Sequence, residues 1–576
     1  MGDQIPGVAG LGYAMRKLLR GLDRFELFIL GASLLGGVLF LFLPQNSVLS
    51  WFTTDDAFYY FVTAKNISLG LGSTFDGIAL TNGYHPLWLL ICVPIFALSR
   101  VNLYLPLRLI ILLQYALTAI SSILLYKLTR SYISQKAACI IAFLWLFLPA
   151  IQSTLMVGGV ESTVNGLLIL AVLYGIDKLR KTALSSPDLN LRYAVLGTLA
   201  GLTILARLDN VFLIGFIGIW VGINLLREHF NDQVTKKFSL VDIQPLIWFG
   251  LPIIILVGAY LSWNQIHFGS IIPVSGAVKH WWGEISGDPY GNPPDSLRQL
   301  YLETFASTNR NIVPFWLPYK FGQSIAQPLN HFLASMGLPP VVKTLWIVIA
   351  LGLVALLEIP SLIRAIDRLS LLPLLLGSAF QVGYYKIGGS VATRSWYWVQ
   401  EVLLFLLLAG VVLGIVLRLL ERHHIGKYLA NITTAIILIV VGIAQMRYFW
   451  RNFVDVDRGL HEYLATARFL QDETEPGSII GIVASGSAAY FTQGRTIVNL
   501  DGLINGFEYL RALQHDQAAE YLRSINVQYV MGSEVLLLEN PPYASNFVGQ
   551  LSPLQDAPSA GRENTLWKLH GEPGDE

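Results

Sequence analysis

Two adjacent carboxylates near the start of the chain, Asp55 and Asp56, are the first residues whose types and spacing suggest chemistry. They follow the first long apolar run and lie in an aromatic stretch, residues 54–61. A charged pair where a helix leaves a bilayer is costly, and a like charge beside a carboxylate in low-dielectric surroundings raises its proton affinity. Such a group suits a general base that accepts a proton from a hydroxyl nucleophile.

The same pair also fits a structural role. Thr54, Asp55 or Asp56 could cap a helix that continues through Phe58 and Tyr60, because acceptor side chains are favoured at helix N-termini. Neighbouring residues diverge by about 100° on a helix, so one carboxylate can react while the other supports the structure. The two interpretations are therefore compatible.

The composition is that of a polytopic membrane protein. Of 576 residues, 54% are hydrophobic and 13% are charged, and the mean hydropathy is +0.54. An average soluble domain has about a quarter of its residues charged. No basic domain or zinc-type spacing is present, so no nucleic-acid partner is expected. Cys92 and Cys139 both lie in apolar runs, where buried thiols are expected rather than a disulfide.

Basic residues set the expected orientation. Four of them, between positions 16 and 24, precede the first apolar run, as in an uncleaved signal anchor with a cytoplasmic N-terminus. The segment 85–98 decides the rest of the topology. If it crosses the bilayer, the basic loop 127–136 faces outward and the later loops invert. If it is re-entrant or interfacial, every short basic loop stays inside.

The second arrangement predicts an α-helical protein of the bacterial cytoplasmic membrane with about 11 transmembrane helices and an outer C-terminus. Each span needs roughly 17–25 residues. The expected spans are 26–43, 106–126, 137–154, 161–176, 192–206, 208–226, 245–266, 341–358, 371–387, 397–417 and 429–446.

We expect two domains. Residues 1–449 form the membrane domain with outer loops at 48–84 and 267–340, and residues 450–576 form a small extracytoplasmic α/β domain. The predicted elements of the second domain are a helix at 460–470 and strands at 478–483, 496–500 and 527–531. The turn 485–487 lacks a full GxGxxG pattern, so we expect acceptor binding or packing over a catalytic cavity rather than a nucleotide site.

Further ionisable residues fall on the same outer face under this topology: Glu161, Arg207 with Asp209, Lys279 and Arg394. Ionisable groups where the chain meets lipid or a cavity are functional candidates. Each has a structural alternative. Arg207 and Asp209 can form a local ion pair, which Glu161 can join. The aromatic residues beside Lys279 and Arg394 are also typical of an interfacial belt.

His85 follows a tight turn at 82–83 and starts the segment whose topology is open. It can be a metal ligand, a phosphate donor or a hydrogen-bonded structural histidine. The sequence alone leaves these three roles open.

Six motifs, in their order along the chain, resemble the GT-C superfamily of integral-membrane glycosyltransferases. They are 55–60, 81–88, 158–162, 206–209, 273–279 and 394–397, and the resemblance extends to 499–503 near the C-terminus. The most similar group is the mycobacterial-type arabinofuranosyltransferases and their bacterial relatives. The resemblance covers most of the chain.

This resemblance implies inverting transfer of a sugar from a polyprenyl-phosphate donor to a hydroxyl of a glycan or glycolipid acceptor on the outer face. Asp55 would take the place of the family's base, with Asp56 orienting it or assisting with the acceptor or a divalent cation. Cationic groups would stabilise the departing phosphate. The implied donor- and substrate-binding residues are Lys279, Arg394, Arg207, Glu161, His85, Tyr84 and Tyr59.

Other classes of protein remain alternatives. Transfer to a protein acceptor, as by protein O-mannosyltransferases, fits the same motifs. A transporter or flippase for lipid-linked sugars would show internal repeats and polar residues near the middle of the membrane, whereas the ionisable residues here gather on one side. A non-enzymatic scaffold is the third alternative, if the acidic pair serves only as a helix cap.

Overall fold

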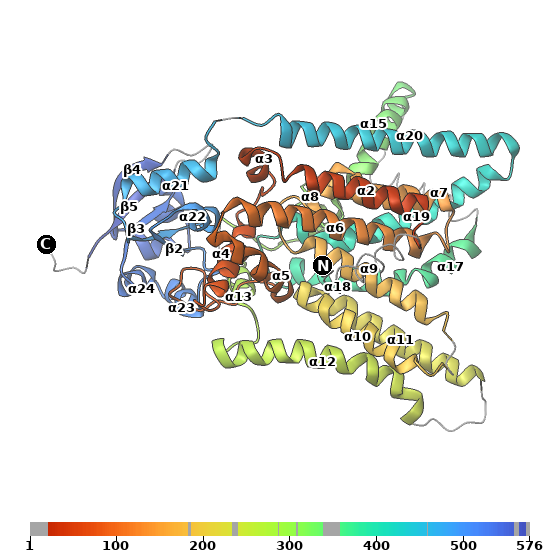
Figure 1. The fold of residues 1–576 in the computed structure, drawn as a ribbon, viewed down its shortest axis with the longest axis horizontal. Coiled ribbons are helices and arrows are strands. Elements are labelled where there is room, and N and C mark those ends of the chain that lie inside the picture. Colours follow the sequence, from red (N-terminus) through yellow and green to blue (C-terminus); the bar gives the residue numbers. More distant parts are fainter. Residues whose placement is uncertain are drawn as a thin grey trace, which may run out of the picture.

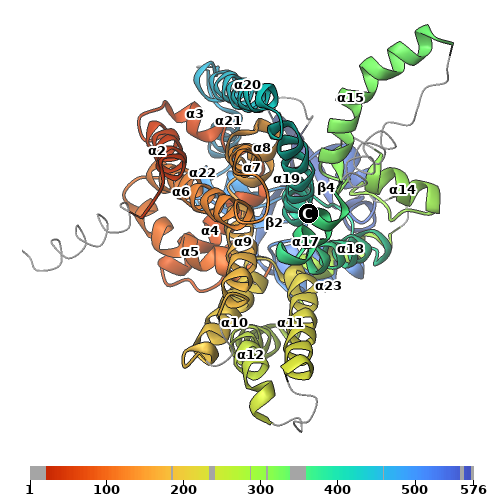
Figure 2. The ribbon, with the colours of Figure 1, turned by 90° about the vertical axis from the view of Figure 1, so that its right-hand side faces the viewer.

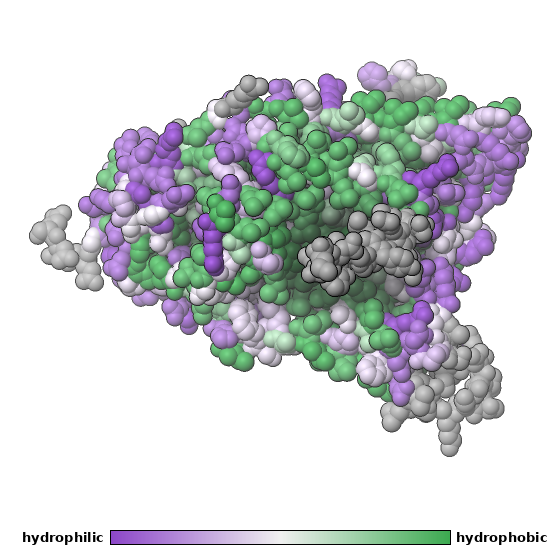
Figure 3. Space-filling model, viewed as in Figure 1, coloured by the Kyte–Doolittle hydropathy of each residue, from purple (hydrophilic) through white to green (hydrophobic). Residues whose placement is uncertain are grey.

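The computed structural model describes residues 21–182, 186–232, 240–285, 287, 289–306, 309–337, 358–457, 459–557 and 564–571. Long helices run along the long axis of the molecule, and a small sheet with short helices covers one end (Figure 1). In Figure 3 an apolar surface lies between two hydrophilic ends, as expected for a protein that crosses a bilayer. The chain is an integral membrane protein.

Seven helices among the described residues are long and apolar enough to cross a membrane. An eighth span results if α7 (Gln135–Phe147) and α8 (Pro149–Leu155), which are bent by 57° at their break, count as one. The seven helices are α6 (Tyr104–Thr129), α9 (Ser162–Leu179), α10 (Leu189–Ala206), α11 (Val211–Asp232, with the short η2, Leu208–Asn210), α12 (Leu240–Phe268), α19 (Val399–Glu421) and α20 (His424–Phe449).

The predicted number of about 11 spans is not confirmed. Two predicted spans form helices at or just below the lower limit of the roughly 17–25 residues that a span needs, α2 (Arg24–Leu39) with 16 residues and α18 (Leu371–Ile387) with 17. The predicted span 341–358 lies, apart from its last residue, outside the described residues. Hydropathy located the apolar runs, but the lengths of the helices depend on turns and caps that hydropathy does not register.

The segment whose topology was open forms α5 (Pro86–Phe96) and the short helix η1 (Ala97–Arg100). At about 1.5 Å per residue these two helices reach roughly 20 Å, less than the roughly 30 Å of a hydrocarbon core. Helix α5 packs on α4 (Asp56–Ser68), with the rings of Phe61 and Phe96 stacked at 4.4 Å. Cys92 is buried and free of any disulfide, in keeping with its apolar surroundings.

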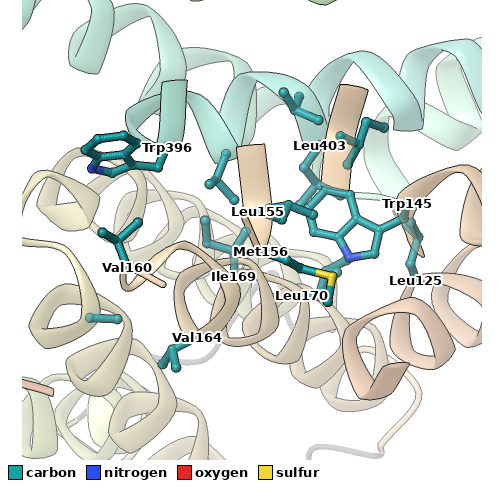
Figure 4. Packing of buried hydrophobic residues seen from close by; sticks show 14 of the residues in the cluster. Leu125, Trp145, Leu155, Met156, Val160, Val164, Ile169, Leu170, Trp396 and Leu403 are labelled. Atoms are coloured by element: carbon teal, nitrogen blue, oxygen red, sulfur yellow. The ribbon is translucent and has the colours of Figure 1, made fainter. Parts of the chain in front are cut away.

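The core of the membrane domain lies between α6, α7, α9 and α19. Figure 4 shows Trp145 of α7 between Leu125 of α6, Leu170 of α9 and Leu403 of α19. The indole Nε1 of Trp145 donates a hydrogen bond of 2.8 Å to the hydroxyl of Ser121 on α6. Close packing of this kind fixes the relative positions of the helices, and therefore of the residues at their ends.

Helices α12 and α20 lie at the periphery of the bundle (Figure 2). Only 11% of the apolar window of α12 and 17% of that of α20 is buried inside the molecule. Because both helices are strongly apolar, their exposed faces are suited to contact with lipid chains. The other helices before the C-terminal sheet are α3 (Gln45–Leu49), α13 (Val274–Trp282), α14 (Leu297–Phe305), α15 (Trp316–Ser335), α17 (Ile359–Arg368), η3 (Ser395–Trp398) and η4 (Trp450–Val454).

A five-stranded sheet lies near the C-terminus with strand order β2-β1-β3-β5-β4. The strands are β1 (Ile479–Ile482), β2 (Thr496–Asn499), β3 (Val527–Gly532), β4 (Leu551–Ala557) and β5 (Asn564–Leu569). Strand β1 pairs in parallel with β2 and β3, while β5 pairs antiparallel with β3 and β4. The helices are α21 (Glu462–Glu473), α22 (Gly486–Phe491), α23 (Phe507–Gln514), α24 (Ala518–Ser524), η5 (Val535–Glu539) and α25 (Ala544–Phe547). We call the region from α21 to β5 the C-terminal domain.

Candidate functional site

A small cavity lies where the membrane domain meets the C-terminal domain. It encloses about 70 Å³, which is room for a few water molecules. Six residues predicted from the sequence line it: Asp56, Tyr59, Tyr84, His85, Glu161 and Lys279. The other lining residues are Tyr60, Gly83, Val160, Ser275, Trp396, Tyr397 and Leu503. We call this the site cavity. Segments far apart in the sequence therefore converge on one space.

Two local features position the side chains of the cavity. Gly158 and Gly159 adopt φ of +119° and +78°, which residues with a Cβ rarely adopt, and the turn that they form places Glu161 at the N-cap position of α9. The side-chain oxygen of Asn82 accepts a hydrogen bond of 2.9 Å from the backbone N–H of Val274. This bond fixes the start of α13, the helix that carries Lys279.

A buried cluster of charges adjoins the cavity, and one of its members, Glu161, also lines it. The guanidinium of Arg207 donates to both oxygens of Asp209, at 3.2 and 2.9 Å, and to Glu161. Arg207 and Glu161 are each 1% exposed and Asp209 is 8% exposed. The hydroxyls of Tyr60 and Tyr385 donate to Glu161 and Asp209 at 3.1 and 2.8 Å. Arg207 is therefore an internal counter-ion for two carboxylates. The ion pair of Arg207 with Asp209 and its ion pair with Glu161 belong to one network.

Tyr397 connects this cluster to Lys279. Its ring centroid lies 4.3 Å from the guanidinium carbon of Arg207 and 5.0 Å from the Lys279 nitrogen. The Lys279 ammonium donates a hydrogen bond of 2.5 Å to the hydroxyl of Tyr397. No ion pair between described residues involves Lys279. Its positive charge is therefore available to an anion that enters the cavity.

The acidic pair divides between two environments. Asp56 lines the site cavity. The carboxylate of Asp55 accepts hydrogen bonds of 2.5 and 2.7 Å from the backbone N–H groups of Gly486 and Ser487, at the start of α22. Asp55 occupies the N-cap position of α4, but its side chain does not cap that helix. Burial raises the pKa of Asp55 to about 7, although the backbone donors of Ser487 and Gly486 act to lower it.

The acidic pair does not fit a shared cation site. The Asp55 oxygens are engaged by the C-terminal domain, whereas Asp56 faces the cavity. In the part of the chain that the structure describes, no group of three or more His, Cys, Asp or Glu side chains could hold a metal ion.

The C-terminal domain contributes to the cavity wall through the loop after β2. Leu503 lines the cavity, and Asp501 accepts a hydrogen bond of 2.6 Å from the hydroxyl of Tyr59. Burial raises the pKa of Asp501, and the bond from Tyr59 acts to lower it. The hydroxyl of Thr81 donates to the backbone carbonyl of Asn505 at 3.2 Å. This loop and the turn before α5 therefore enclose the cavity together.

A substitution at Gly83 tests this enclosure. A Cβ at this position would lie 1.9 Å from the carbonyl oxygen of Leu503, so the two backbones must separate. We expect Gly83→Ala to expose the loop after β2, seen as faster amide hydrogen exchange across residues 499–506. Gly442→Ala on α20 is the control, since the added Cβ meets no described atom within 4 Å outside the adjacent residues and backbone of its own helix. Unchanged exchange in Gly83→Ala would contradict this contact.

His85 is a mostly buried, neutral group in the cavity wall. Burial lowers its pKa to about 4, with Glu161 acting in the opposite direction. Its Nε2 lies 3.8 Å from the Glu161 oxygen, and its Nδ1 has no hydrogen-bond partner among the described residues. At neutral pH the imidazole carries no charge, so Lys279 rather than His85 is the cation that lines the cavity.

This lowered pKa predicts a pH dependence of stability. Between pH 6.5 and about 4 the unfolded chain binds a proton at His85 more tightly than the folded protein does, so acidification favours unfolding. The loss is at most about 3 kcal/mol by pH 4. We expect His85→Asn to lose less stability than the wild type over this range, measured by thermal unfolding in detergent. Parallel pH profiles for the two proteins would show that His85 does not titrate in this way.

Arg394 is not among the described residues that line the cavity. Its guanidinium donates a hydrogen bond of 3.5 Å to the backbone carbonyl of Thr393. Arg207 also lies behind the lining residues. The residue of the 394–397 motif with the closest link to Lys279 is Tyr397, which our sequence prediction did not single out. Asp501 and Leu503 were missed as well, although both lie in the 499–503 motif that carried part of the resemblance.

A family described as a domain of unknown function (DUF8728) matches residues 451–569. No curated protein matches the chain. The Archaeoglobus fulgidus oligosaccharyltransferase tethered with an acceptor peptide containing the NVT sequon is 13% identical, with 92% of this chain and 72% of that chain covered and a TM-score of 0.50. ArnT from Cupriavidus metallidurans, in the apo state, is 12% identical, with 92% of this chain and 97% of that chain covered and a TM-score of 0.48.

The archaeal oligosaccharyltransferase is a glycosyltransferase of the GT-C fold. At 13% identity, the likeness to the archaeal enzyme concerns the fold, and it agrees with the order of motifs in the sequence. The finer resemblance to arabinofuranosyltransferases is not confirmed by either neighbour. The chain therefore shares the fold of the archaeal GT-C enzyme.

Proposed function

We propose that this protein is a glycosyltransferase that moves a sugar from a polyprenyl-phosphate donor to an acceptor hydroxyl. The observation that carries the proposal is that Asp56 and Lys279 line the same cavity, and that the Lys279 ammonium has no ion-pair partner among the described residues. They share a cavity at the end of a bundle of apolar helices, where a lipid-borne phosphate can arrive from the bilayer. The GT-C fold of the structural neighbours supports this general kind of reaction.

The chemistry assigns one role to each group. Asp56 accepts the proton of the acceptor hydroxyl as its oxygen attacks the anomeric carbon of the donor. The bond between that carbon and the phosphate oxygen breaks, and the electron pair leaves with the polyprenyl phosphate. Lys279, held by the hydroxyl of Tyr397, stabilises the developing negative charge. Attack opposite to the leaving group inverts the anomeric centre.

The charge of Arg207 is directed elsewhere. Glu161 and Asp209 already neutralise the charge of Arg207. Arg207 therefore positions Glu161 and Tyr397 in the cavity wall and does not bind the donor phosphate. Asp55 anchors the C-terminal domain on α4, which keeps Tyr59 and Leu503 at the cavity. We therefore propose Asp56 as the base and Asp55 as a structural anchor, the reverse of the order expected from the sequence.

The site cavity must widen to admit a sugar. Its volume of about 70 Å³ is below the roughly 300–1,000 Å³ of typical ligand pockets. The motifs favour arabinofuranose as the first sugar to test, and a glycan or glycolipid on the extracytoplasmic face as the acceptor. A protein acceptor is the second candidate, because the archaeal oligosaccharyltransferase is seen with an acceptor peptide.

The test offers the purified full chain a panel of polyprenyl-phosphate sugars together with a mixture of cell-envelope glycans and glycolipids as acceptors, and measures the release of polyprenyl phosphate by mass spectrometry. We expect one donor to be consumed, and Lys279→Gln to slow its consumption by about tenfold to a thousandfold. Lys427→Gln, a charge change at the opposite end of α19 and α20, is the control. Consumption of no donor, or equal rates for Lys279→Gln and wild type, would contradict the proposal.

A further inference from the structure

A second, larger hollow lies on the other side of α4. It encloses about 710 Å³ between the last turns of α4, η1, the start of α6 and the segment from α22 to β2. An adjoining pocket of about 260 Å³ shares Gln45, Asn102 and Tyr104 with it. We call the two together the polar groove. The groove has no lining residue in common with the site cavity.

The position of the groove separates it from the proposed catalytic groups. Lys65, which lines the groove, follows Asp56 by nine residues on the same helix. The rise along α4 between them is about 14 Å. A ligand of the groove therefore does not occupy the place of the reacting sugar.

The groove is cationic. Lys65, Arg100 and Arg495 line the larger hollow, and Arg108 lines the adjoining pocket. The carboxylate that lines it, Asp76, accepts hydrogen bonds from two backbone N–H groups at 2.8 and 2.9 Å. Within the described ranges, no ion pair involves any of the four cations. A positive charge without a protein counter-ion suits an anionic ligand.

Individual groups in the groove also lack partners. The Lys65 nitrogen lies 6.0 Å from the ring of Tyr490 and makes no described hydrogen bond, and burial lowers its pKa. Thr492 is 7% exposed, and its hydroxyl has no hydrogen-bond partner among the described residues. Arg495 differs, because it donates to backbone carbonyls of residues 471, 474 and 493 and so contributes charge alone. Arg100 donates through one guanidinium nitrogen to the backbone carbonyl of Ser68, and its other N–H groups make no hydrogen bond among the described residues. Lys65, Arg100 and Thr492 therefore have hydrogen-bonding capacity left for a ligand.

The groove opens at the edge of the apolar surface. Tyr104, shared by both hollows, is the first residue of the candidate span α6. The neighbouring Leu105 is 37% exposed, Val101 is 84% exposed and Phe42 is 82% exposed. Cations next to exposed apolar side chains at the end of a span form the arrangement that a lipid with an anionic headgroup requires.

We propose that the polar groove binds the phosphate-bearing headgroup of an anionic membrane lipid, with the acyl chains on the apolar surface at Val101 and Leu105. Lys65 and Arg100 bind the phosphate, and the hydroxyl of Thr492 is a further partner for the headgroup. Because the groove lies between α4 and α22, the bound lipid stabilises the docking of the C-terminal domain on the membrane domain (Figure 1). This site is independent of the proposed transfer reaction.

The test titrates the purified full chain, in a neutral detergent, with phosphatidylglycerol or phosphatidylcholine and counts bound lipids by native mass spectrometry. We expect phosphatidylglycerol to bind more tightly than phosphatidylcholine. The double variant Lys65→Gln/Arg100→Gln should weaken phosphatidylglycerol binding by about thirtyfold, and Lys65→Gln alone by about fivefold. The single variant keeps the test open if the double variant folds poorly.

The matched control is Arg364→Gln/Lys427→Gln, which removes two exposed charges from the opposite end of the molecule and should leave binding unchanged. Equal affinities for the two lipids, or wild-type binding by the Lys65 and Arg100 variants, would overturn the proposal. Glycerol phosphate is added as a competitor in the last arm. Displacement of the lipid by similar concentrations of glycerol phosphate would show a site for free phosphate esters instead of a lipid.

Discussion

Asp56→Asn is expected to slow sugar transfer by about a hundredfold to ten-thousandfold, because the amide cannot accept the proton of the acceptor hydroxyl. The side chain keeps its size and its place in the first turn of α4, so the fold should persist. The rate of polyprenyl-phosphate release, measured with the donor that the wild type consumes, checks the effect. Unchanged binding of polyprenyl phosphate by the variant would place the loss in the chemical step.

Asp55→Asn is the matched comparison, because it makes the same change one residue earlier. An asparagine retains one acceptor oxygen for the two backbone N–H groups of Gly486 and Ser487, so the docking of the C-terminal domain should weaken by about 1–3 kcal/mol. Transfer should stay within about tenfold of the wild type. Loss of transfer in Asp55→Asn with full activity in Asp56→Asn would restore the order expected from the sequence.

Arg207→Gln is expected to cause the largest loss of stability, about 3–5 kcal/mol, because it leaves Glu161 and Asp209 buried without a counter-ion. A fall in the apparent unfolding temperature in detergent measures the effect. Arg207→Lys should recover part of it, since a lysine restores the charge without the bidentate geometry.

The control for Arg207 is Arg192→Gln on α10. Arg192 pairs with Asp188 at 2.8 Å, but both side chains are nearly half exposed, so the change should cost less than about 1 kcal/mol. Similar losses in the two variants would show that Arg207 is not the counter-ion of a buried cluster. Full stability of Arg207→Gln would lead to the same conclusion.

The acidic pair shows how far the sequence could be interpreted. Helix geometry predicts that adjacent carboxylates diverge, but it does not predict which of them lines the cavity. That depends on where α4 begins and on Gly486, whose missing side chain lets the backbone of α22 approach Asp55. A contact between residues 431 positions apart leaves no local pattern in the sequence.

The same limit applies to the rest of the site. The motifs identified six residues that line the cavity, because each motif marks a turn or helix end on the same side of the bundle. The short helix η3 turns Tyr397 toward Lys279, while Arg394 lies before that helix. In the C-terminal domain the parallel strands β1 to β3 were predicted from their apolar runs. Strands β4 and β5 were missed, because β4 is mostly exposed and contains Pro553.

The most direct test of the account is a cryo-electron microscopy structure of the purified full chain with polyprenyl phosphate bound. We predict that the phosphate lies within hydrogen-bond distance of the Lys279 ammonium, in the widened site cavity, with Asp56 facing the position of the anomeric carbon. A phosphate bound away from Lys279, with the site cavity unchanged, would contradict the assignment of this cavity as the place of transfer.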